Sequence, residues 1–216
     1  LYVADFGKAP SLKVFDGEFK PVSQAFDQPF DTNRNGRVDA GEYAPFNVQA
    51  LTLPNGEPRI FVAYAMTQPC PKDAIAEGAC AKGEVFPGEE DISKPGLGRL
   101  AEFTEDGRLV HVWEDGGKLN APWGLAFAPK DFGALSGMLL VANFSDGTIA
   151  AYDPATRRFV DYLRSEKGKP VVIDKLWGLL FGNGESLGDK NALYFAAGPK
   201  DETDGLFGSL RPAGGR

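Results

Sequence analysis

The sequence predicts an all-β fold made of repeated antiparallel sheets. Its 27 glycines and 16 prolines divide the 216 residues into short pieces, and the runs between them are rich in valine, leucine, phenylalanine and tyrosine. Similar strand-like segments also recur along the chain. The longest apolar runs are much shorter than the roughly 20 residues of a membrane helix, so we expect no transmembrane span.

The charge balance argues against one class of partner. Thirty acidic residues outnumber 23 lysines and arginines, which gives a formal net charge of -7. A protein that binds nucleic acid needs a basic surface to gather phosphates. We therefore expect no nucleic-acid partner.

Three kinds of segment repeat in the same order. The most regular kind reads LYVADF, IFVAYA, LLVANF and LYFAAG, at residues 1–6, 60–65, 139–144 and 193–198. A second kind precedes three of these copies, at residues 44–48, 121–125 and 175–179. A third kind follows, at residues 12–16, 100–104 and 149–153, and leads through a polar turn into another apolar run. Each unit is therefore predicted to be a four-stranded meander.

A repeat of about 40 to 55 residues with four strands is typical of a β-propeller blade. The copies are unequally spaced because two insertions separate them, a polar loop at residues 31–42 and a cysteine-containing stretch at residues 69–96. Insertions are tolerated in loops. A sandwich of short strands is the alternative, but a sandwich gives no reason for one strand-turn-strand pattern to repeat. We interpret residues 1–216 as one partial propeller domain.

The number of repeats is small for a closed ring. The copies make only about three to four four-stranded blades, and an open stack leaves an apolar face and strand edges in water. The chain also begins with LYVADF, without an initiator methionine or a signal-peptide core. We expect it to be the C-terminal part of a larger propeller of the six-bladed type. Its partners would be N-terminal blades of the same precursor or another protein subunit.

Residues 31–42 read DTNRNGRVDAGE, which matches an EF-hand-like calcium loop. Calcium needs six to eight hard oxygen ligands, and a glycine at the sixth position allows the sharp turn. The predicted ligands, with Arg37 contributing its backbone carbonyl, are Asp31, Asn33, Asn35, Arg37, Asp39 and Glu42. Pro29 and Pro45 flank the loop and exclude the usual helical frame. We expect a structural clip rather than a calcium sensor. A solvated polar turn is the alternative.

The two cysteines, Cys70 and Cys80, lie in the second insertion. No histidine or further cysteine is near enough in sequence to complete a zinc site. A disulfide that staples the loop is the preferred interpretation, and it favours an oxidising compartment. Two free thiols in a cytosolic loop are the alternative.

Other polar and aromatic residues have simpler explanations. The acidic run at residues 201–204 is typical of a solvated turn, and His111, the only histidine, lies in a strand-like run without the partners of a catalytic triad. Trp123 and Trp177 each precede a glycine at the start of an expected inner strand. Packing is their expected role, and lining a channel mouth is the alternative.

The chain resembles an uncharacterised bacterial family of secreted six-bladed-type propellers, some of which carry PEP-CTERM sorting signals. The resemblance is densest between residues 121 and 209, in segments such as APWGLAFAP, LLVANFSDG and LYFAAGP. It implies a propeller fold and a secreted, periplasmic or cell-surface location in a bacterium. It implies no reaction.

Two functions remain in view. The first is a secreted, calcium-stabilised propeller that acts as a binding or structural module, as in a surface assembly. The second is a lactonase-like hydrolase in which a channel metal activates water. Such an enzyme needs metal ligands at several inner-strand ends, where this chain has Asn47, Trp123 and Trp177. Only the asparagine can coordinate a metal, so we favour the non-enzymatic function unless missing blades complete the site.

Overall fold

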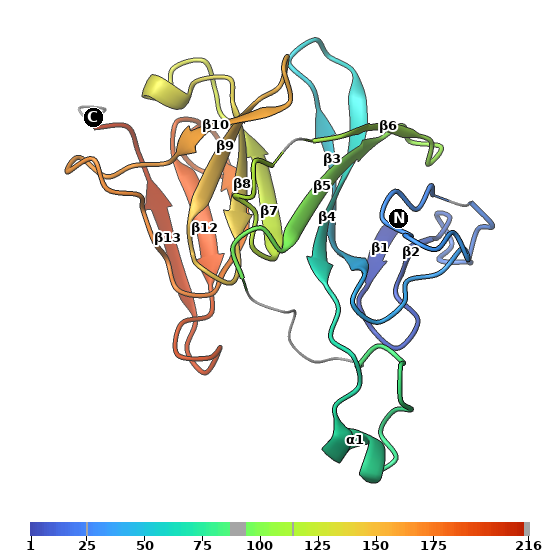
Figure 1. The fold of residues 1–216 in the computed structure, drawn as a ribbon. Coiled ribbons are helices and arrows are strands. Elements are labelled where there is room, and N and C mark those ends of the chain that lie inside the picture. Colours follow the sequence, from blue (N-terminus) through green and yellow to red (C-terminus); the bar gives the residue numbers. More distant parts are fainter. Residues whose placement is uncertain (25, 87–93, 114, 214–216) are drawn as a thin grey trace.

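A computed structural model describes residues 1–24, 26–86, 94–113 and 115–213. These residues form thirteen strands, one short α-helix and one 3-10 turn at Gly133–Leu135 (Figure 1). The prediction of an all-β fold is confirmed. No helix in the described ranges is long and apolar enough to cross a membrane.

The strands form four antiparallel sheets in which neighbours in space are neighbours in sequence. The first sheet contains β1 (Tyr2–Asp5) and β2 (Ser11–Val14). The second contains β3 (Tyr43–Thr52), β4 (Pro58–Met66), β5 (Gly98–Phe103) and β6 (Leu109–Val112). The third contains β7 (Pro122–Phe127), β8 (Leu139–Asn143), β9 (Ile149–Asp153) and β10 (Arg158–Tyr162). The fourth contains β11 (Leu176–Phe181), β12 (Leu193–Ala197) and β13 (Leu206–Leu210).

The predicted repeat corresponds to these sheets. The four copies of the most regular segment form β1, β4, β8 and β12. The prediction of uniformly four-stranded blades is only partly correct, because the first sheet has two described strands and the fourth has three. None of the four sheets closes on itself within the described residues. A closed propeller is therefore not confirmed.

The sheets pack face to face, and the strand alternation decides which side chain goes to which neighbour. In β4, Ile60 and Val62 join a core cluster with the first sheet, whereas Phe61 and Ala63 join a cluster with the third. In β8 the same positions behave in the same way: Leu139 packs toward the second sheet and Leu140 toward the fourth. We call the side of a sheet that packs against the sheet before it in sequence its preceding face. The side that packs against the next sheet is its following face.

A buried cluster of charged side chains connects the second and third sheets. Glu102 of β5 is 1% exposed and lies 3.1 Å from the guanidinium of Arg59 on the neighbouring strand. Its other oxygen lies 3.5 Å from Arg157, which belongs to the turn between β9 and β10. The indole N–H of Trp113 donates to the same oxygen at 3.2 Å. The carboxylate is therefore buried with its partners in place.

A β-bulge interrupts the first strand of the second, third and fourth sheets at corresponding places. The register shifts between Pro45 and Asn47 in β3, between Pro122 and Leu125 in β7, and between Leu176 and Leu179 in β11. Bulges redirect side chains. Here each shift includes a large aromatic residue, and the three residues are Phe46, Trp123 and Trp177.

These three rings pack against one another. The ring centroids of Phe46 and Trp123 are 4.8 Å apart, and those of Trp123 and Trp177 are 4.5 Å apart, both in edge-to-face arrangements. Phe144, which directly follows β8, adds a fourth ring with its centroid 4.3 Å from that of Trp177. The packing role expected for the two tryptophans is what the structure shows.

The first strands approach closely at one glycine. A Cβ atom on Gly124 would lie 2.5 Å from the carbonyl oxygen of Trp177 and 2.6 Å from the nitrogen of Leu179. On the other side of β7, the Gln49 side chain bridges the two first strands, since its amide donates to the carbonyl of Leu125 and accepts from the N–H of that residue. Contact between the third and fourth sheets therefore depends on the absence of a side chain at residue 124.

We predict that Gly124→Ala destabilises the protein by about 1 to 3 kcal/mol, the usual range for overpacking. Gly178 occupies the corresponding place in β11, but a Cβ there meets nothing within 4 Å. Gly178→Ala is therefore the matched control and should be near neutral. Chemical denaturation of both variants measures the difference. Equal stability of the two variants would contradict the close-approach argument.

Candidate metal centre

The predicted calcium loop lies directly before β3, so its last ligand, Glu42, adjoins the first residue of that strand. Asp31 closes the loop from the other end. Its two carboxylate oxygens accept the backbone N–H of Gly36 at 2.7 Å and of Asn35 at 3.2 Å. Gly36 has a φ of 78°, a conformation that glycine adopts without a steric cost. The loop thus turns where the sequence predicts.

Three of the predicted ligands come together in the middle of the loop. The side-chain amides of Asn33 and Asn35 each donate to one Asp39 oxygen at 2.7 Å. Arg37 lies 3.2 Å from the other oxygen of the same carboxylate. These hydrogen bonds from Asn33 and Asn35, helped by Arg37, lower the pKa of Asp39. The Asp39 carboxylate therefore contacts the positively polarised or charged groups of three neighbouring side chains.

Glu42 is held at the base of the loop. It is 7% exposed, and one of its oxygens accepts the backbone N–H of Thr32 at 2.8 Å as well as the hydroxyl of that residue. Its other oxygen accepts the N–H of Asp39 at 3.0 Å. A buried carboxylate joins the two ends of the loop.

The carboxylate and amide oxygens of the loop are ligands of the type that a hard cation prefers, but they do not converge on one point. The amide oxygens of Asn33 and Asn35 each accept one backbone N–H, both at 3.0 Å, and such an oxygen has a second lone pair. The described residues hold no group of three or more histidine, cysteine, aspartate or glutamate side chains placed to bind a metal. The carboxylates of Asp31, Asp39 and Glu42 are bonded to N–H donors instead.

Thr67, which no sequence motif marks, ties the loop to the end of β4. Its side chain belongs to a fully buried residue, and its hydroxyl lies 3.1 Å from the carbonyl of Asp39 and 3.0 Å from that of Glu42. It also accepts the N–H of Gly41 at 3.0 Å. The hydroxyl thus joins residue 67 to residues 39–42, which are distant from it in sequence. Only a knowledge of strand pairing could have found this residue.

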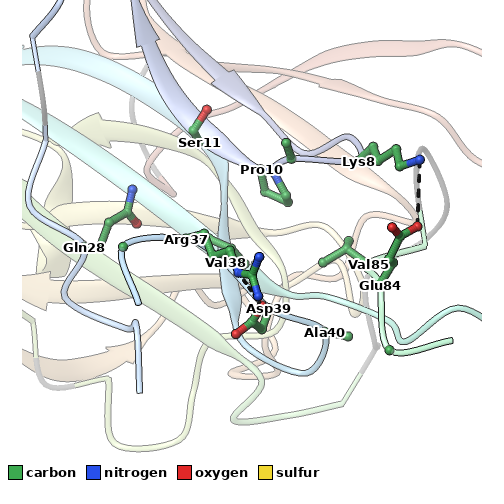
Figure 2. Close-up of a pocket in the computed structure, with 13 residues that line it drawn as sticks. Lys8, Pro10, Ser11, Gln28, Arg37, Val38, Asp39, Ala40, Glu84 and Val85 are labelled. Carbon is green, nitrogen blue, oxygen red and sulfur yellow. Dashed lines mark ion pairs between the residues drawn. The ribbon is translucent and has the colours of Figure 1, made fainter. Parts of the chain in front are cut away.

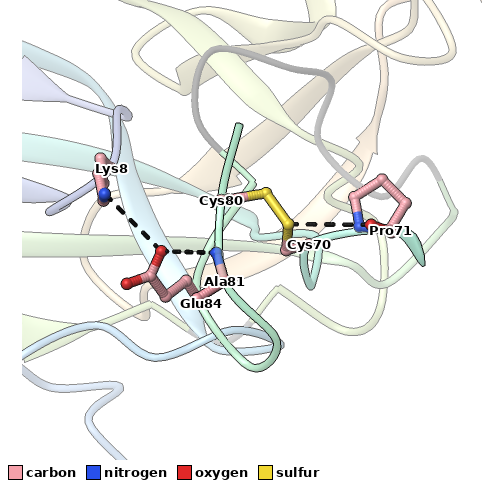
Figure 3. Close-up of a disulfide and its surroundings, with 6 residues drawn as sticks. All are labelled: Lys8, Cys70, Pro71, Cys80, Ala81 and Glu84. Atoms are coloured by element: carbon pink, nitrogen blue, oxygen red, sulfur yellow. Dashed lines mark hydrogen bonds and ion pairs between the residues drawn. A yellow bond between two sulfur atoms is a disulfide. The ribbon is translucent and has the colours of Figure 1, made fainter. Parts of the chain in front are cut away.

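The cysteine insertion forms the disulfide that the sequence predicts. Cys70 and Cys80 are bonded, with their Cα atoms 6.0 Å apart (Figure 3). The insertion also contains the short helix α1 (Lys72–Ala76), which extends away from the sheets in Figure 1. Residues 87–93 of the insertion lie outside the described residues.

The loop of residues 31–42 and the cysteine insertion meet at a cavity of about 440 Å³. Arg37, Val38 and Asp39 line one side of it (Figure 2). Glu84 of the insertion lies on another side, 3.8 Å from Lys8 of the loop that joins β1 and β2. Three separate loops therefore build this region together.

The other predicted residues stand apart from this centre. His111 lies on β6 opposite Glu102. The acidic run at residues 201–204 is exposed, and Asp204 pairs with Lys200 at 2.7 Å. Asn47 uses its amide nitrogen to donate to the carbonyl of Trp123 at 2.8 Å. Its side chain therefore connects two first strands.

Two proteins of Acanthamoeba polyphaga mimivirus, both described as uncharacterized, are similar to nearly the whole chain. One is 31% identical over 211 residues, which are 97% of this chain and 45% of the relative. The other is 30% identical over 210 residues, which are 97% of this chain and 48% of the relative. A third uncharacterized protein of this virus is 34% identical over 84 residues, or 39% of this chain and 16% of the relative. No protein-family model matches the chain.

These comparisons correct the resemblance to a bacterial family. The relatives are viral proteins and no family model supports the bacterial assignment, so that assignment is wrong. The chain spans about half the length of the first two relatives. Nothing in their descriptions indicates an enzymatic activity.

We predict that Thr67→Val destabilises the protein by about 1 to 3 kcal/mol, because it removes the hydroxyl that accepts the N–H of Gly41 and contacts the carbonyls of Asp39 and Glu42. Thr67→Ser keeps the hydroxyl and should cost less. Hydrogen exchange should show the extra opening in residues 39–42 rather than in β8 or β9. Equal losses of stability in the two variants would contradict the role of the hydroxyl.

Replacing both Cys70 and Cys80 by alanine should destabilise the protein by about 2 to 3 kcal/mol in the chain-entropy model for a short loop. Limited proteolysis followed by mass spectrometry should then cut first within residues 70–86, because the disulfide closes that segment. Unchanged stability and unchanged cleavage would show that the bond does not constrain the insertion.

Proposed function

We propose that this chain is part of a β-propeller in which the loop of residues 31–42 binds one calcium ion, and that it acts as a binding or structural module. The observation that carries the calcium proposal is the way the loop matches its motif. Asp31 closes on Gly36 at the sixth position, and a buried Glu42 anchors the twelfth.

The proposed ion would act as a clip between the loop and the second sheet. Asp31, Asn33, Asn35, Asp39, Glu42 and the carbonyl of Arg37 would hold it, and hard oxygens of this kind are what calcium requires. Glu42 leads directly into β3, and Thr67, just after β4, holds the carbonyl of Glu42. An ion here would therefore stabilise the ends of two paired strands.

The arrangement of the sheets supports the propeller part of the proposal. Consecutive meanders lie face to face, and the bulges fall at corresponding places in β3, β7 and β11. Aromatic rings from these three strands meet at one end. First strands gathered around a common axis are the defining feature of propeller blades.

The residues at the ends of the first strands fit a binding or structural module better than they fit a hydrolase. A channel-metal hydrolase requires several oxygen or nitrogen ligands that converge there. In the described residues these ends carry Phe46, Trp123 and Trp177, packed ring against ring, and the amide of Asn47 is already used between strands. The best oxygen ligands lie instead in the loop before β3.

The disulfide supports a location in an oxidising environment, such as outside a cell or on the surface of a particle. The bond between Cys70 and Cys80 closes an insertion that extends away from the sheets. We therefore propose a secreted or surface-exposed protein.

Isothermal calorimetry with calcium chloride tests the proposal. We expect one site, and a free energy of unfolding that rises by about 2.7 kcal/mol when free calcium is 100 times the dissociation constant. Asp31→Ala should abolish both effects. Asp16→Ala is the matched control, because Asp16 also bonds to backbone N–H groups of an exposed turn outside the loop, at 2.8 and 2.9 Å.

Two results would reject the calcium site. One is the absence of binding heat and of any stability change at millimolar calcium. The other is equal calcium binding by the wild type and by Asp31→Ala. Metal-dependent turnover of a lactone panel that is lost on changing Asn47 would instead favour the hydrolase.

A further inference from the structure

The stack of sheets ends in two apolar faces that no described residue covers. Each internal contact joins the following face of one sheet to the preceding face of the next. The first sheet therefore has an uncovered preceding face, and the fourth sheet has an uncovered following face. These two sheets lie at opposite sides of the molecule in Figure 1.

The uncovered face of the first sheet carries the side chains that alternate away from the core. Leu1 and Val3 are 62% and 37% exposed, although the same positions of β4 and β8 are buried. Val3 lies opposite Lys13 of β2, so Lys13 shares this face. Phe19 is 75% exposed beside it. These residues line an open cavity of about 440 Å³.

The uncovered face of the fourth sheet is larger and more apolar. Leu180 is paired with Tyr194, and Phe207 is paired with Ala196, so all four side chains are on one side of the sheet. Phe207 is 75% exposed, and its ring stacks on that of Tyr194 at a centroid distance of 5.9 Å. With Leu187, these residues line a cavity of about 560 Å³.

Inside the molecule, a following face always packs against a preceding face, and the two uncovered faces are one of each kind. Tyr194 corresponds to Phe61 of β4 and Leu140 of β8, both of which are fully buried against the next sheet.

We infer that a second copy of this chain covers both faces, head to tail, with the fourth sheet of each copy against the first sheet of the other. A head-to-tail contact closes into a ring when the rotation between copies allows it. Two copies satisfy all four end faces at once. The relatives, which are about twice as long as this chain, are compatible with a ring built from two such stacks. The inference rests on the proposed propeller packing but not on calcium.

Analytical ultracentrifugation of the 216-residue chain is the first test, and it gives a result whether or not calcium binds. We expect a dimer of twice 23.2 kDa, with no larger species as concentration rises. A monomer at all concentrations would overturn the inference, and so would an open series of growing oligomers.

Two variants place one charge on each face. Val3→Glu alters the first sheet, at the position opposite Lys13, which already pairs with Asp5. Phe207→Glu alters the fourth sheet. The dissociation constant of the dimer should rise at least about tenfold in either variant alone, because every interface of that dimer contains the substitution. Val172→Glu is the matched control, since Val172 is 64% exposed but lies on neither face.

Mixing the two variants separates head-to-tail from face-to-self pairing. In a head-to-tail dimer the mixture contains one unaltered interface, so the two variants should associate with each other more tightly than either does with itself. If only one of the two variants loses self-association, like faces are pairing and the inference is wrong. Circular dichroism of each variant confirms that it is folded.

Discussion

The architecture depends on one constraint, which is that the central strands carry apolar side chains on both of their faces. Ile60 and Val62 point one way and Phe61 and Ala63 the other, and all four are at most 1% exposed. A sheet of this kind cannot leave one face in water without a cost of about 25 cal/mol for each Å² of apolar surface. Each sheet therefore needs a neighbour on both sides, and the stack follows from that need.

The polar features are placed around this stack rather than within it. The loop of residues 31–42 precedes β3 and the disulfide insertion follows β4. The hydroxyl of Thr67 connects the end of β4 to this loop. The main exception is Glu102, which is buried between two arginines. A buried carboxylate is tolerated there because its charge is paired across the contact of the second and third sheets.

Much of the fold and part of the candidate site could be predicted. Copies such as LLVANF gave the positions of β1, β4, β8 and β12, because alternation and turn residues are local signals. The Asp31 to Gly36 turn and the disulfide were also correct. The number of strands in each sheet was not predicted correctly. The polar turns next to β2 and β13 do not indicate whether a further strand pairs with either of these strands. The bacterial resemblance failed because short repeated strand patterns occur in unrelated proteins.

By itself, the sequence determined the all-β class, the order of the strands, the loop that can turn at Gly36 and the cysteines that can pair. These features depend on residues close together in the chain. Only the tertiary structure decided that Thr67 holds the loop of residues 31–42, that Gly124 must lack a side chain while Gly178 need not, and that Leu180 and Phe207 remain exposed. Each of these depends on which sheet lies against which, and contacts between distant segments leave no local pattern in the sequence.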